Sequence, residues 1–369
     1  MENGPRPLEN LGLVMAVQKP NLDFWREKRV LVTGHTGFKG AWLSLWLDRL
    51  GARVGGLSLV PPTKPNLFSL ANIQGDVAHC ICDIRDPKAT AIAIADFKPE
   101  IVFHLAAQAL VRPSYDDPLA TFATNVMGTA HVLDAIRRTS SVTTCIVATT
   151  DKVYRNEETG HAFSESAPLG GHDPYSASKA AAEMVVQSYH KSFLAEHGVA
   201  VAAARAGNAI GGGDWSAERL IPDAVKAWSH GNQVRIRRPD AFRPWQHVLE
   251  PLFGYIMLAE AIWDNPNLAA PFNFGPNSDD VHSVRAVIEQ AQAAFGIGDV
   301  DFATDHAGPH EAGLLSLDNA KAKHQLGVSP RWSTSDAVSI TMNWYRRYNE
   351  GADARALCYA DIDMFEAAR

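Results

Sequence analysis

The stretch Arg29-Val30-Leu31-Val32-Thr33-Gly34-His35-Thr36-Gly37-Phe38-Lys39-Gly40 decides the fold of this 369-residue chain. Its first five residues are mostly apolar and β-branched, which predicts a short buried strand. Three glycines follow at intervals of three residues, and residues 40–50 then carry apolar side chains at helical spacing. Strand, glycine turn and helix in this order predict a βαβ unit that holds a dinucleotide, because glycines let the backbone approach a pyrophosphate at a helix N-terminus.

The alternation of strands and helices continues along the chain. Further strands are expected at 53–59, 77–81, 101–105, 143–150 and 199–204, and helices at 87–97, 115–139 and 174–196. Pro61 and Pro65 exclude regular structure from the connection after the second strand. Strands separated by helices predict an α/β fold with a doubly wound parallel Rossmann sheet.

The pattern divides the chain into three parts. Residues 28–210 are expected to form the dinucleotide-binding Rossmann domain. Over residues 211–369 the alternation of strands and helices becomes irregular, and helices are expected at 251–263, 283–294 and 334–349. This irregular pattern predicts a smaller mixed C-terminal substrate lobe, with some segments returning to the Rossmann domain. Residues 1–27 contain three prolines and mixed polarity, and are expected to form a flexible N-terminal arm.

Composition excludes several classes of function. A formal net charge of -7 argues against binding to nucleic acid or to anionic membranes. Apolar runs stay well short of the ~20 residues that span a bilayer, and the N-terminus lacks the order of a signal peptide, so a cytoplasmic protein is expected. The spacing of the four cysteines matches no zinc site or redox motif, so they are expected to be free thiols and no metal is predicted. They are Cys80, Cys82, Cys145 and Cys358.

Tyr175 and Lys179 stand four residues apart in the predicted helix 174–196, so both side chains lie on one helix face. A tyrosine is a poor base at neutral pH because its pKa is about 10. A neighbouring ammonium is expected to lower that pKa, so that the phenolate can take the proton of a carbinol during hydride transfer. The fifth strand ends nearby in sequence at Thr150-Asp151-Lys152, at the sheet edge where open α/β folds bind ligands.

From about Arg29 to past Trp263 the chain resembles the extended short-chain dehydrogenase/reductase family. The resemblance implies that Tyr175 and Lys179 are the active-site pair and that they also bind NAD. The other residues implied to bind NAD are Gly34, His35, Thr36, Gly37, Phe38, Lys39, Gly40, Asp83, Ile84, Leu105, Ala106, Ala107 and Gln108. His104 opens the family's H-x-A-A segment, and Asn125 matches a structural asparagine. The second strand ends without the carboxylate that binds the adenosine ribose of NAD, and Lys64 follows, so these residues leave NAD and NADP both open.

The Thr-Asp pair at 150–151 resembles the nucleotide-sugar 4,6-dehydratases. The resemblance implies that Thr150 hydrogen-bonds the hydroxyl that is oxidised and that Asp151 protonates the departing hydroxyl. Lys152 stands where the dTDP-glucose enzymes carry glutamate and where the CDP-glucose enzymes carry lysine, which favours CDP-glucose as substrate and deoxysugar or O-antigen biosynthesis as the pathway. Lys152 could act as a base towards C5 or as a fixed charge that stabilises the enolate, and the residues leave both roles open.

The substrate side is expected after the sixth strand. Asn208 matches a family asparagine near the substrate phosphates, and Arg219, Arg235 and Arg243 are candidates for the diphosphate because guanidinium groups bind phosphate bidentately. Pro244 replaces an acidic residue of the family pattern. His247 is expected to be structural. Trp215 and Trp245 could pack in the core or flank the nucleotide base, and the sequence does not favour either role.

Two other functions remain open at this stage. A nucleotide-sugar 4-epimerase needs the tyrosine and lysine but no acid, and a non-catalytic dinucleotide-binding sensor needs neither. Asp151 argues against the first, and the complete Thr150, Tyr175 and Lys179 set argues against the second. The family resemblance also implies a homodimer or higher homo-oligomer, formed through the helices predicted at 115–139 and 174–196.

Overall fold

The computed structural model describes residues 18–158, 160–303 and 315–368. Its centre is a seven-stranded sheet in the order β11-β6-β5-β4-β1-β2-β3, in which neighbouring strands run parallel. The strands are β1 (Arg29–Thr33), β2 (Arg53–Ser58), β3 (Ala78–Ile81), β4 (Ile101–His104), β5 (Thr144–Ala148), β6 (Ala200–Ala206) and β11 (Phe272–Phe274). The predicted parallel Rossmann sheet is confirmed, and β11 adds a strand that was not predicted.

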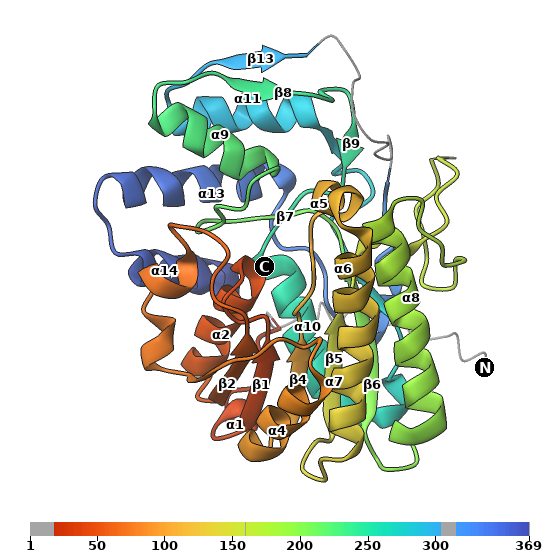
Figure 1. Ribbon diagram of the computed structural model, residues 1–369. Helices are drawn as coiled ribbons and strands as arrows, with labels where there is room; N and C mark the ends of the chain where they lie inside the picture. The colour runs from red at the N-terminus through yellow and green to blue at the C-terminus, as the bar shows by residue number, and fades with distance from the viewer. Residues whose placement is uncertain (1–17, 159, 304–314, 369) are drawn as a thin grey trace, which may run out of the picture.

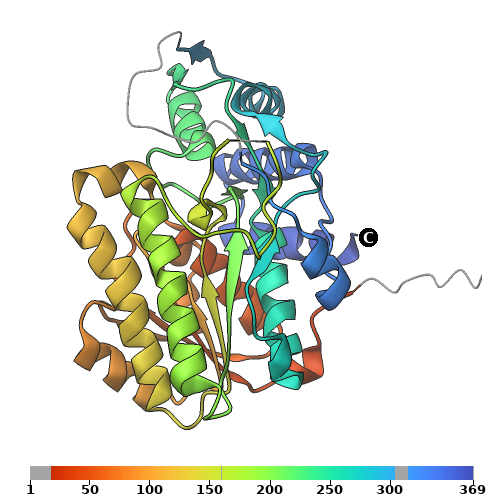
Figure 2. The same cartoon turned by 90° about the vertical axis from the view of Figure 1, so that its right-hand side faces the viewer.

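Helices cover both faces of the sheet (Figures 1 and 2). One face carries α4 (Pro87–Phe97), α7 (Gly128–Arg137) and α8 (Pro174–Tyr189), and the other carries α2 (Phe38–Arg49), α10 (Leu249–Asp264) and α14 (Ala354–Ala367). Strand β1 buries Val30 and Val32 in the core on the α2 side and Leu31 in the core on the α7 side. Burial on both faces explains why the central strands are apolar throughout rather than alternating.

The first described residues are packed against the sheet domain. Helix α1 (Leu22–Trp25) is capped by Asn21, and the Trp25 ring is fully buried. Its Nε1 donates a hydrogen bond to Glu260 Oε1 at 2.6 Å. The flexible arm expected over residues 1–27 is therefore wrong for residues 21–25, because burial of the indole fixes this segment; residues 1–17 lie outside the described residues.

The single long helix expected at 115–139 is divided into four pieces. They are α5 (Val111–Asp116), α6 (Pro118–Phe122), a π-helical turn η2 (Ala123–Met127) and α7. Pro118 causes the first break, because proline disfavours helical geometry at the residue before it. The Asp117 side chain then caps α6 by accepting a hydrogen bond from Ala120 N.

The C-terminal part forms an upper lobe over the carboxyl edge of the sheet (Figure 1). Its elements are β7 (Ala209–Ile210), α9 (Leu220–Ser229), β8 (Val234–Ile236), β9 (Phe242–Arg243), β10 (Gln246–His247), β12 (His282–Ser283), α11 (Val284–Phe295), β13 (Val300–Phe302) and α13 (Thr334–Asn349). The strands pair as β10 with β7, β12 with β9 and β13 with β8. Helix α10, strand β11 and helix α14 return from this lobe to the sheet domain.

The remaining elements are short. They are α3 (Leu67–Leu70), η1 (Ile73–Gly75), η3 (Asp151–Val153), η4 (His190–Leu194), η5 (Pro266–Leu268) and α12 (Ala320–Leu326). Within the parts of the chain that the structure describes, no helix has both the length and the apolar character needed to cross a membrane.

Candidate active site

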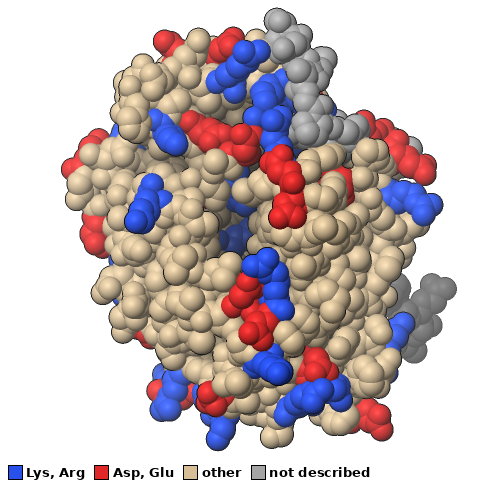
Figure 3. Space-filling view, in the orientation of Figure 1, with Lys and Arg blue, Asp and Glu red and all other residues tan. Residues whose placement is uncertain are grey.

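A cavity of about 900 Å³ lies between the carboxyl edge of the sheet and the upper lobe. In the space-filling view of Figure 3 it is a hollow near the middle of the molecule, with Lys and Arg side chains inside it and along its rim. Residues from the glycine turn, from the ends of β2, β4, β5 and β6, from the start of α8 and from the upper lobe line it. This is the place where parallel α/β sheets bind ligands.

The glycine turn after β1 forms one wall of the cavity. Gly34 has a φ of +77°, and a Cβ at this position would lie 2.8 Å from Ala106 N. A Cβ on Gly40 would lie 2.1 Å from Gly34 O, so both positions require glycine. Helix α2 begins at Phe38, and no side chain caps its N-terminus at Gly37. Free N–H groups at a helix start fit the pyrophosphate of a dinucleotide.

The other predicted cofactor residues line the same cavity, except for one side chain. Thr36, Phe38, Lys39, Asp83, Ile84 and residues 105–108 are among the lining residues, whereas His35 is not. The His35 ring is buried behind the turn, where its Nε2 lies 2.7 Å from His79 Nδ1. Burial lowers the pKa of His35 to about 4, so the ring is neutral at physiological pH.

The end of β2 explains the missing ribose carboxylate. A Cβ on Gly56 would lie 2.3 Å from the His35 ring, so this position has no room for a side chain. Ser58 lines the cavity and its hydroxyl lies 2.8 Å from that of Thr36. Asp83, on the next strand end, accepts hydrogen bonds from Arg85, which hold the pKa of its carboxyl below the ordinary value. Lys64 is not among the lining residues.

A hydrogen-bonded chain fixes the segment after β4. The Thr33 hydroxyl accepts from the backbone N–H groups of Leu105 and Ala106, at 3.1 Å each, and lies 2.7 Å from His104 Nδ1. Because Thr129 donates its hydroxyl proton to Asn125 O, its oxygen accepts from His104 Nε2 at 3.0 Å. Burial lowers the pKa of His104 to about 3, so His104 is a neutral strut. The Asn125 side chain continues this hydrogen-bonded chain: its Oδ1 accepts from Gln108 N and its Nδ2 donates to Ser178 Oγ.

Thr150, Asp151 and Lys152 follow β5 as the short turn η3, and all three line the cavity. The Asp151 carboxylate is fully buried. Its Oδ1 accepts from the Thr150 hydroxyl and from Lys152 Nζ, both at 2.9 Å. Lys152 Nζ also donates to Asn208 Oδ1 at 3.3 Å. The ion pair with Asp151 and the contact with Asn208 fix Lys152 as a cation at the floor of the cavity.

Tyr175 and Lys179 project from the first two turns of α8, which Asp173 caps and Pro174 starts. Both side chains are buried and line the cavity. The expected lowering of the Tyr175 pKa by Lys179 is wrong in this structure. Burial raises the pKa of Tyr175 to about 12, although a hydrogen bond with Thr150 acts in the opposite direction. Lys179 Nζ donates instead to Ala148 O at 2.8 Å, and burial lowers its pKa to about 8.

Lys39 is a cation of the site that was predicted only as part of the cofactor turn. Burial, and then repulsion by Arg219, lower its pKa to about 8, while Asp151 attracts it. Lys179 and Lys152 are further like-charged neighbours. Lys39, on the glycine turn, is therefore close enough to the residues at the end of β5 and on α8 for their charges to interact with its ammonium.

The predicted substrate residues lie on the opposite wall. Asn208, Arg219, Arg235 and Arg243 all line the cavity. Arg219 pairs with Asp214 at 3.0 Å, and Arg235 lies 3.9 Å from Asp301. Sequence reasoning missed Arg112, Arg237 and Arg238, which also line it. Arg237 and Arg238 belong to the arginine-rich segment before Trp245, but a run of charges does not show which of its members reach the cavity, and Arg112 stands outside that segment.

Of the aromatic and proline residues near the predicted substrate side, some line the cavity and others pack in the protein core. A Cβ on Gly207 would meet Pro244 at 2.7 Å and Asp151 Oδ2 at 3.3 Å, so Pro244 packs as an apolar wall behind the acid. Trp245 lines the cavity, whereas Trp215 packs edge-on against Trp344 and Tyr345. His247 is buried with its pKa lowered to about 3, which fits the expected structural role.

Of the four cysteines, Cys82 lines the cavity, and the other three are not among its lining residues. The four cysteines are free thiols as predicted, and three of them are buried. Over residues 18–158, 160–303 and 315–368, no group of His, Cys, Asp and Glu side chains is arranged to hold a metal ion.

Comparison with known proteins agrees with this geometry. A family model described as GDP-mannose 4,6 dehydratase matches residues 31–341. A curated CDP-glucose 4,6-dehydratase from Salmonella typhimurium is 44% identical over 353 residues, which cover 94% of this chain and 98% of that protein. A curated dTDP-glucose 4,6-dehydratase from Xanthomonas campestris is 26% identical over 347 residues, or 85% of this chain and 92% of the relative.

Solved structures share the fold. That of a dTDP-glucose 4,6-dehydratase from Streptomyces venezuelae, with NAD and TYD bound, has a TM-score of 0.74 at 24% identity. It covers 88% of this chain and 99% of the solved chain. A UDP-glucose 4-epimerase from Stenotrophomonas maltophila, with NAD and a formylated UDP-arabinopyranose bound, has the same TM-score at 21% identity. Dehydratases and epimerases thus share this architecture, and the side chains at the cavity must tell them apart.

Proposed function

Because this chain belongs to the family described as GDP-mannose 4,6 dehydratase, we propose that it is an NAD-dependent hydro-lyase, a CDP-glucose 4,6-dehydratase. Its reaction converts CDP-glucose into CDP-4-dehydro-6-deoxyglucose and water. The observation that carries the proposal is the juxtaposition of Asp151 and Lys152 with Tyr175 and Lys179 in one cavity. An epimerase has no need of the acid, and the 44% identical relative is named for this activity.

The residues at the cavity fit NAD. The glycine turn leaves space for a pyrophosphate, and residues 105–108 and Lys179 border the place of the nicotinamide half. A bound NAD would supply the hydride acceptor for oxidation at C4 and the hydride donor for reduction at C6. At the ribose end the neutral Ser58 replaces a carboxylate, so NAD is proposed from its presence in related solved structures as well as from the turn.

Oxidation at C4 is assigned to Thr150, Tyr175 and Lys179. Tyr175 takes the proton of the C4 hydroxyl, and the Thr150 hydroxyl lies within hydrogen-bonding reach of Tyr175. Because burial keeps Tyr175 protonated at rest, it must first release its own proton to water in the cavity, and the phenolate then takes the proton of the C4 hydroxyl. The 4-keto group that results makes the C5 hydrogen acidic, which prepares the sugar for loss of water.

Elimination across C5 and C6 is assigned to Asp151 and Lys152. Asp151 protonates the departing C6 hydroxyl, and its burial against Gly207 and Pro244 keeps water away from the acid. Lys152, held by Asp151 and Asn208, places positive charge where the enolate oxygen develops. With Lys152 held as a cation, the C5 proton passes to the Asp151 carboxylate, which then gives that proton to the departing C6 hydroxyl as the C5–C6 double bond forms and water leaves; the ion pair supports this fixed-charge role more than a role as free base.

The arginines on the upper-lobe wall are proposed to bind the diphosphate of the nucleotide. Arg219, Arg235 and Arg243 line the same cavity as the glycine turn, and Asn208, which lines it too, accepts a hydrogen bond from Lys152. The cytidine base is proposed from the 44% identical relative, since no contact of the site reads the base directly. The product class, a 4-keto-6-deoxy sugar nucleotide, fits deoxysugar supply for O-antigen or lipopolysaccharide, and the four free thiols fit the cytoplasm.

A homodimer or higher homo-oligomer is proposed from the surface of the α7 and α8 layer. Helices α6 and α8 and the turn η2 contact one another and leave large apolar side chains exposed: Leu119 at 81%, Phe122 at 38%, Met127 at 51% and Met184 at 57%. Such a patch is typical of a protein–protein interface. Sedimentation of the purified protein as a monomer would contradict this part of the proposal.

The experiment that tests the function is a substrate panel. Purified protein with NAD is incubated with CDP-, dTDP-, UDP- and GDP-glucose, and the nucleotide sugars are separated by mass. Loss of one water from CDP-glucose in preference to the other nucleotides is the expected result, with solvent deuterium incorporated at C5. Conversion of glucose to galactose without a change in mass would assign the chain to the epimerases instead.

A further inference from the structure

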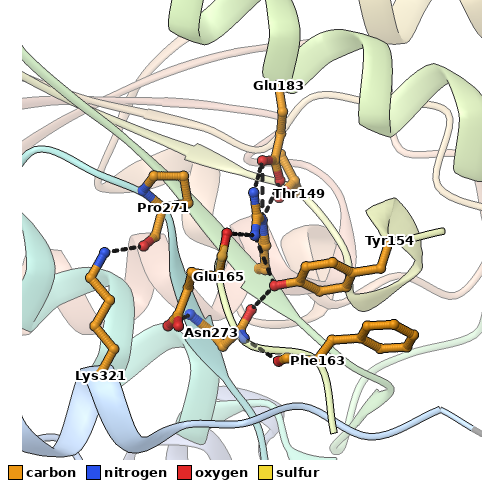
Figure 4. Close-up of polar contacts among 9 residues, drawn as sticks. Thr149, Tyr154, Phe163, Glu165, Glu183, Pro271, Asn273 and Lys321 are labelled. Atoms are coloured by element: carbon orange, nitrogen blue, oxygen red, sulfur yellow. Dashed lines mark hydrogen bonds and ion pairs between the residues drawn. The ribbon is translucent and has the colours of Figure 1, made fainter. Parts of the chain in front are cut away.

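A buried ion pair lies directly beneath the catalytic turn η3. Arg205 of β6 and Glu183 of α8 are each about 1% exposed. Arg205 Nε donates to Glu183 Oε1 at 2.9 Å, and Nη2 donates to Oε2 at 2.5 Å. A two-pronged contact of this kind has little freedom to turn. Figure 4 shows Glu183 with Thr149, Tyr154 and Asn273 in the larger set of polar contacts around this pair.

The same ion pair holds both ends of the segment that carries the acid. Thr149, immediately before the catalytic residues, donates its hydroxyl to Glu183 Oε1 at 2.7 Å. Tyr154, immediately after η3, accepts from Arg205 Nη1 at 2.8 Å. Thr150, Asp151, Lys152 and Val153 therefore lie between two anchors on one rigid pair. Since Glu183 stands four residues after Lys179 on α8, the pair also connects this segment to the helix of Tyr175 and Lys179.

Tyr154 extends the network to the far edge of the sheet. Its Oη donates to Asn273 Oδ1 on β11 at 2.6 Å, and its ring stacks on Phe163 with centroids 4.9 Å apart (Figure 4). Asn273 Nδ2 donates to the backbone oxygens of Phe163 and Asp318. The Tyr154 hydroxyl is thus satisfied as donor and acceptor at once. Its loss leaves Asn273 Oδ1 without its donor and removes one contact of Arg205 Nη1, which keeps its hydrogen bond to Glu165 O at 3.1 Å.

We propose that Arg205, Glu183 and Tyr154 form a positioning network that sets the place of Asp151 and Lys152 relative to Tyr175 and Lys179. None of the three touches the reacting atoms. Elimination depends on this placement more than oxidation does, because both of its residues, Asp151 and Lys152, stand on the anchored turn η3. Of the oxidation residues only Thr150 lies in the anchored segment, whereas Tyr175 and Lys179 stand on helix α8. Displacement of a catalytic group by ~1 Å costs roughly 100-fold in rate, so a loosened anchor is expected to show first at the elimination step.

The test compares oxidation with elimination in the same sample. Tyr154→Phe keeps the stacked ring and removes the hydroxyl. In a quenched single turnover of CDP-glucose, mass separates the 4-keto-glucose nucleotide from the product that has lost water. The elimination rate of Tyr154→Phe is expected to fall by about 10- to 100-fold and the oxidation rate by less than about threefold, so the keto intermediate accumulates. The ratio of the two species does not depend on the fraction of protein that is folded.

Two further variants make the test independent of one substitution. Thr149→Val removes the other anchor and is expected to accumulate the same intermediate, while Thr149→Ser retains the hydroxyl and restores the wild-type ratio. Tyr255→Phe is the matched control, because Tyr255 is equally buried in α10 and its hydroxyl has no hydrogen-bond partner among the described residues. Its ratio of keto intermediate to product should equal that of the wild type.

The inference rests on the proposed dehydratase function, and the two fail in different ways. If the wild type removes water from none of the nucleotide sugars in the panel, the function itself is wrong and the positioning role falls with it. If the wild type dehydrates its substrate but Tyr154→Phe and Thr149→Val slow oxidation and elimination equally, the network only stabilises the fold, and the positioning role is overturned.

Discussion

Asp151 is a fully buried carboxylate whose Oδ1 accepts from Thr150 and Lys152, while its Oδ2 has no hydrogen-bond partner in the described part of the chain. Asp151→Asn keeps the shape of the side chain but cannot protonate a leaving hydroxyl. We expect oxidation of CDP-glucose to persist and elimination to stop, so the 4-keto-glucose nucleotide accumulates in a single turnover. Loss of oxidation with elimination intact would show that Asp151 is not the acid.

Lys152 offers a test between two roles, because its ammonium lies 2.9 Å from Asp151. Lys152→Ala removes the charge, whereas Lys152→Glu places a second carboxylate beside the first. If the lysine acts as fixed positive charge, glutamate should be slower than alanine, because it reverses the field at the enolate. If the lysine acts as a proton acceptor, glutamate should be the faster variant. Exchange of the C5 hydrogen with solvent measures the affected step directly.

Tyr175 is buried and lies within reach of Thr150, where it can accept the C4 proton. Tyr175→Phe removes the acceptor and is expected to leave less than about a tenth of the wild-type kcat, a loss of more than ~1.4 kcal/mol. The control is Tyr189→Phe at the end of the same helix, where the ring packs against the core on the α7 side. A Tyr175→Phe enzyme with near-normal turnover would remove Tyr175 from the mechanism.

Among the elements, helix α10 carries a buried acid that makes stability depend on pH. Glu250 accepts the backbone N–H groups of Arg331 and Trp332 at 2.9 and 2.8 Å, and burial raises its pKa from 4.5 to about 7. The folded protein therefore binds this proton more tightly than the unfolded chain does. Stability should fall as pH rises from about 4.5 to about 7, and the full penalty remains above that range.

Glu250→Gln tests this dependence. Glutamine keeps the accepting oxygen but does not ionise, so the decrease in Tm between about pH 5 and about pH 8 should be smaller than in the wild type. Some decrease should remain, because burial also raises the pKa of Asp361 to about 7. Exposed Glu289 on α11, changed to Gln, is the control and should leave the profile unaltered. An identical profile for Glu250→Gln would contradict the assignment.

The elements that could be predicted are those with a local signal. The β1 stretch, the glycine turn and helix 87–97 depend on residues close in sequence, and the structure places them as expected. Helix α14 had such a signal as well, with Asp353 as its cap and Leu357, Ile362 and Phe365 on its buried face, but it was not predicted. Strand β11 has three residues, which is too short for a periodic pattern.

The candidate site was predictable where residue type and spacing define the chemistry. Each predicted pair consists of residues close in sequence: Tyr175 with Lys179 on α8, and Thr150 with Asp151 after β5. The structure brings the two pairs into one cavity. The contact of Arg205 with Glu183 and the approach of Lys39 to Asp151 join residues on different elements. Such contacts depend on strand order and helix rotation, so no spacing in the sequence reveals them.

The whole molecule combines an acidic total with a basic interior. Its formal net charge is -7, yet Lys39, Lys152, Lys179, Arg219 and further arginines line the cavity. Asp151, Asp214 and Glu218 balance part of this charge through ion pairs with Lys152, Arg219 and Arg237. A negatively charged ligand completes the balance, so a molecule that repels anions at long range attracts them once they reach the hollow.

The cations in the cavity lie close together, so the binding of an anionic ligand should be coupled to uptake of protons from solution. The pKa values of Lys39 and Lys179 are lowered to about 8, so near pH 8 each ammonium is partly deprotonated. A diphosphate in the cavity raises both pKa values again, and binding must then draw protons from the buffer. Titration calorimetry of CDP near pH 8 should give heats that differ between buffers of different ionisation enthalpy. Near pH 6 both lysines already carry their protons, so this uptake should stop, and any remaining difference should have the opposite sign because the terminal phosphate of CDP, with a pKa of about 6, loses its proton on binding. Cytidine, which has no diphosphate, should show no difference at either pH, and equal heats for CDP near pH 8 would contradict this coupling. The enzyme would thus take up substrate together with protons, and the acidity of its surroundings would set how tightly it binds.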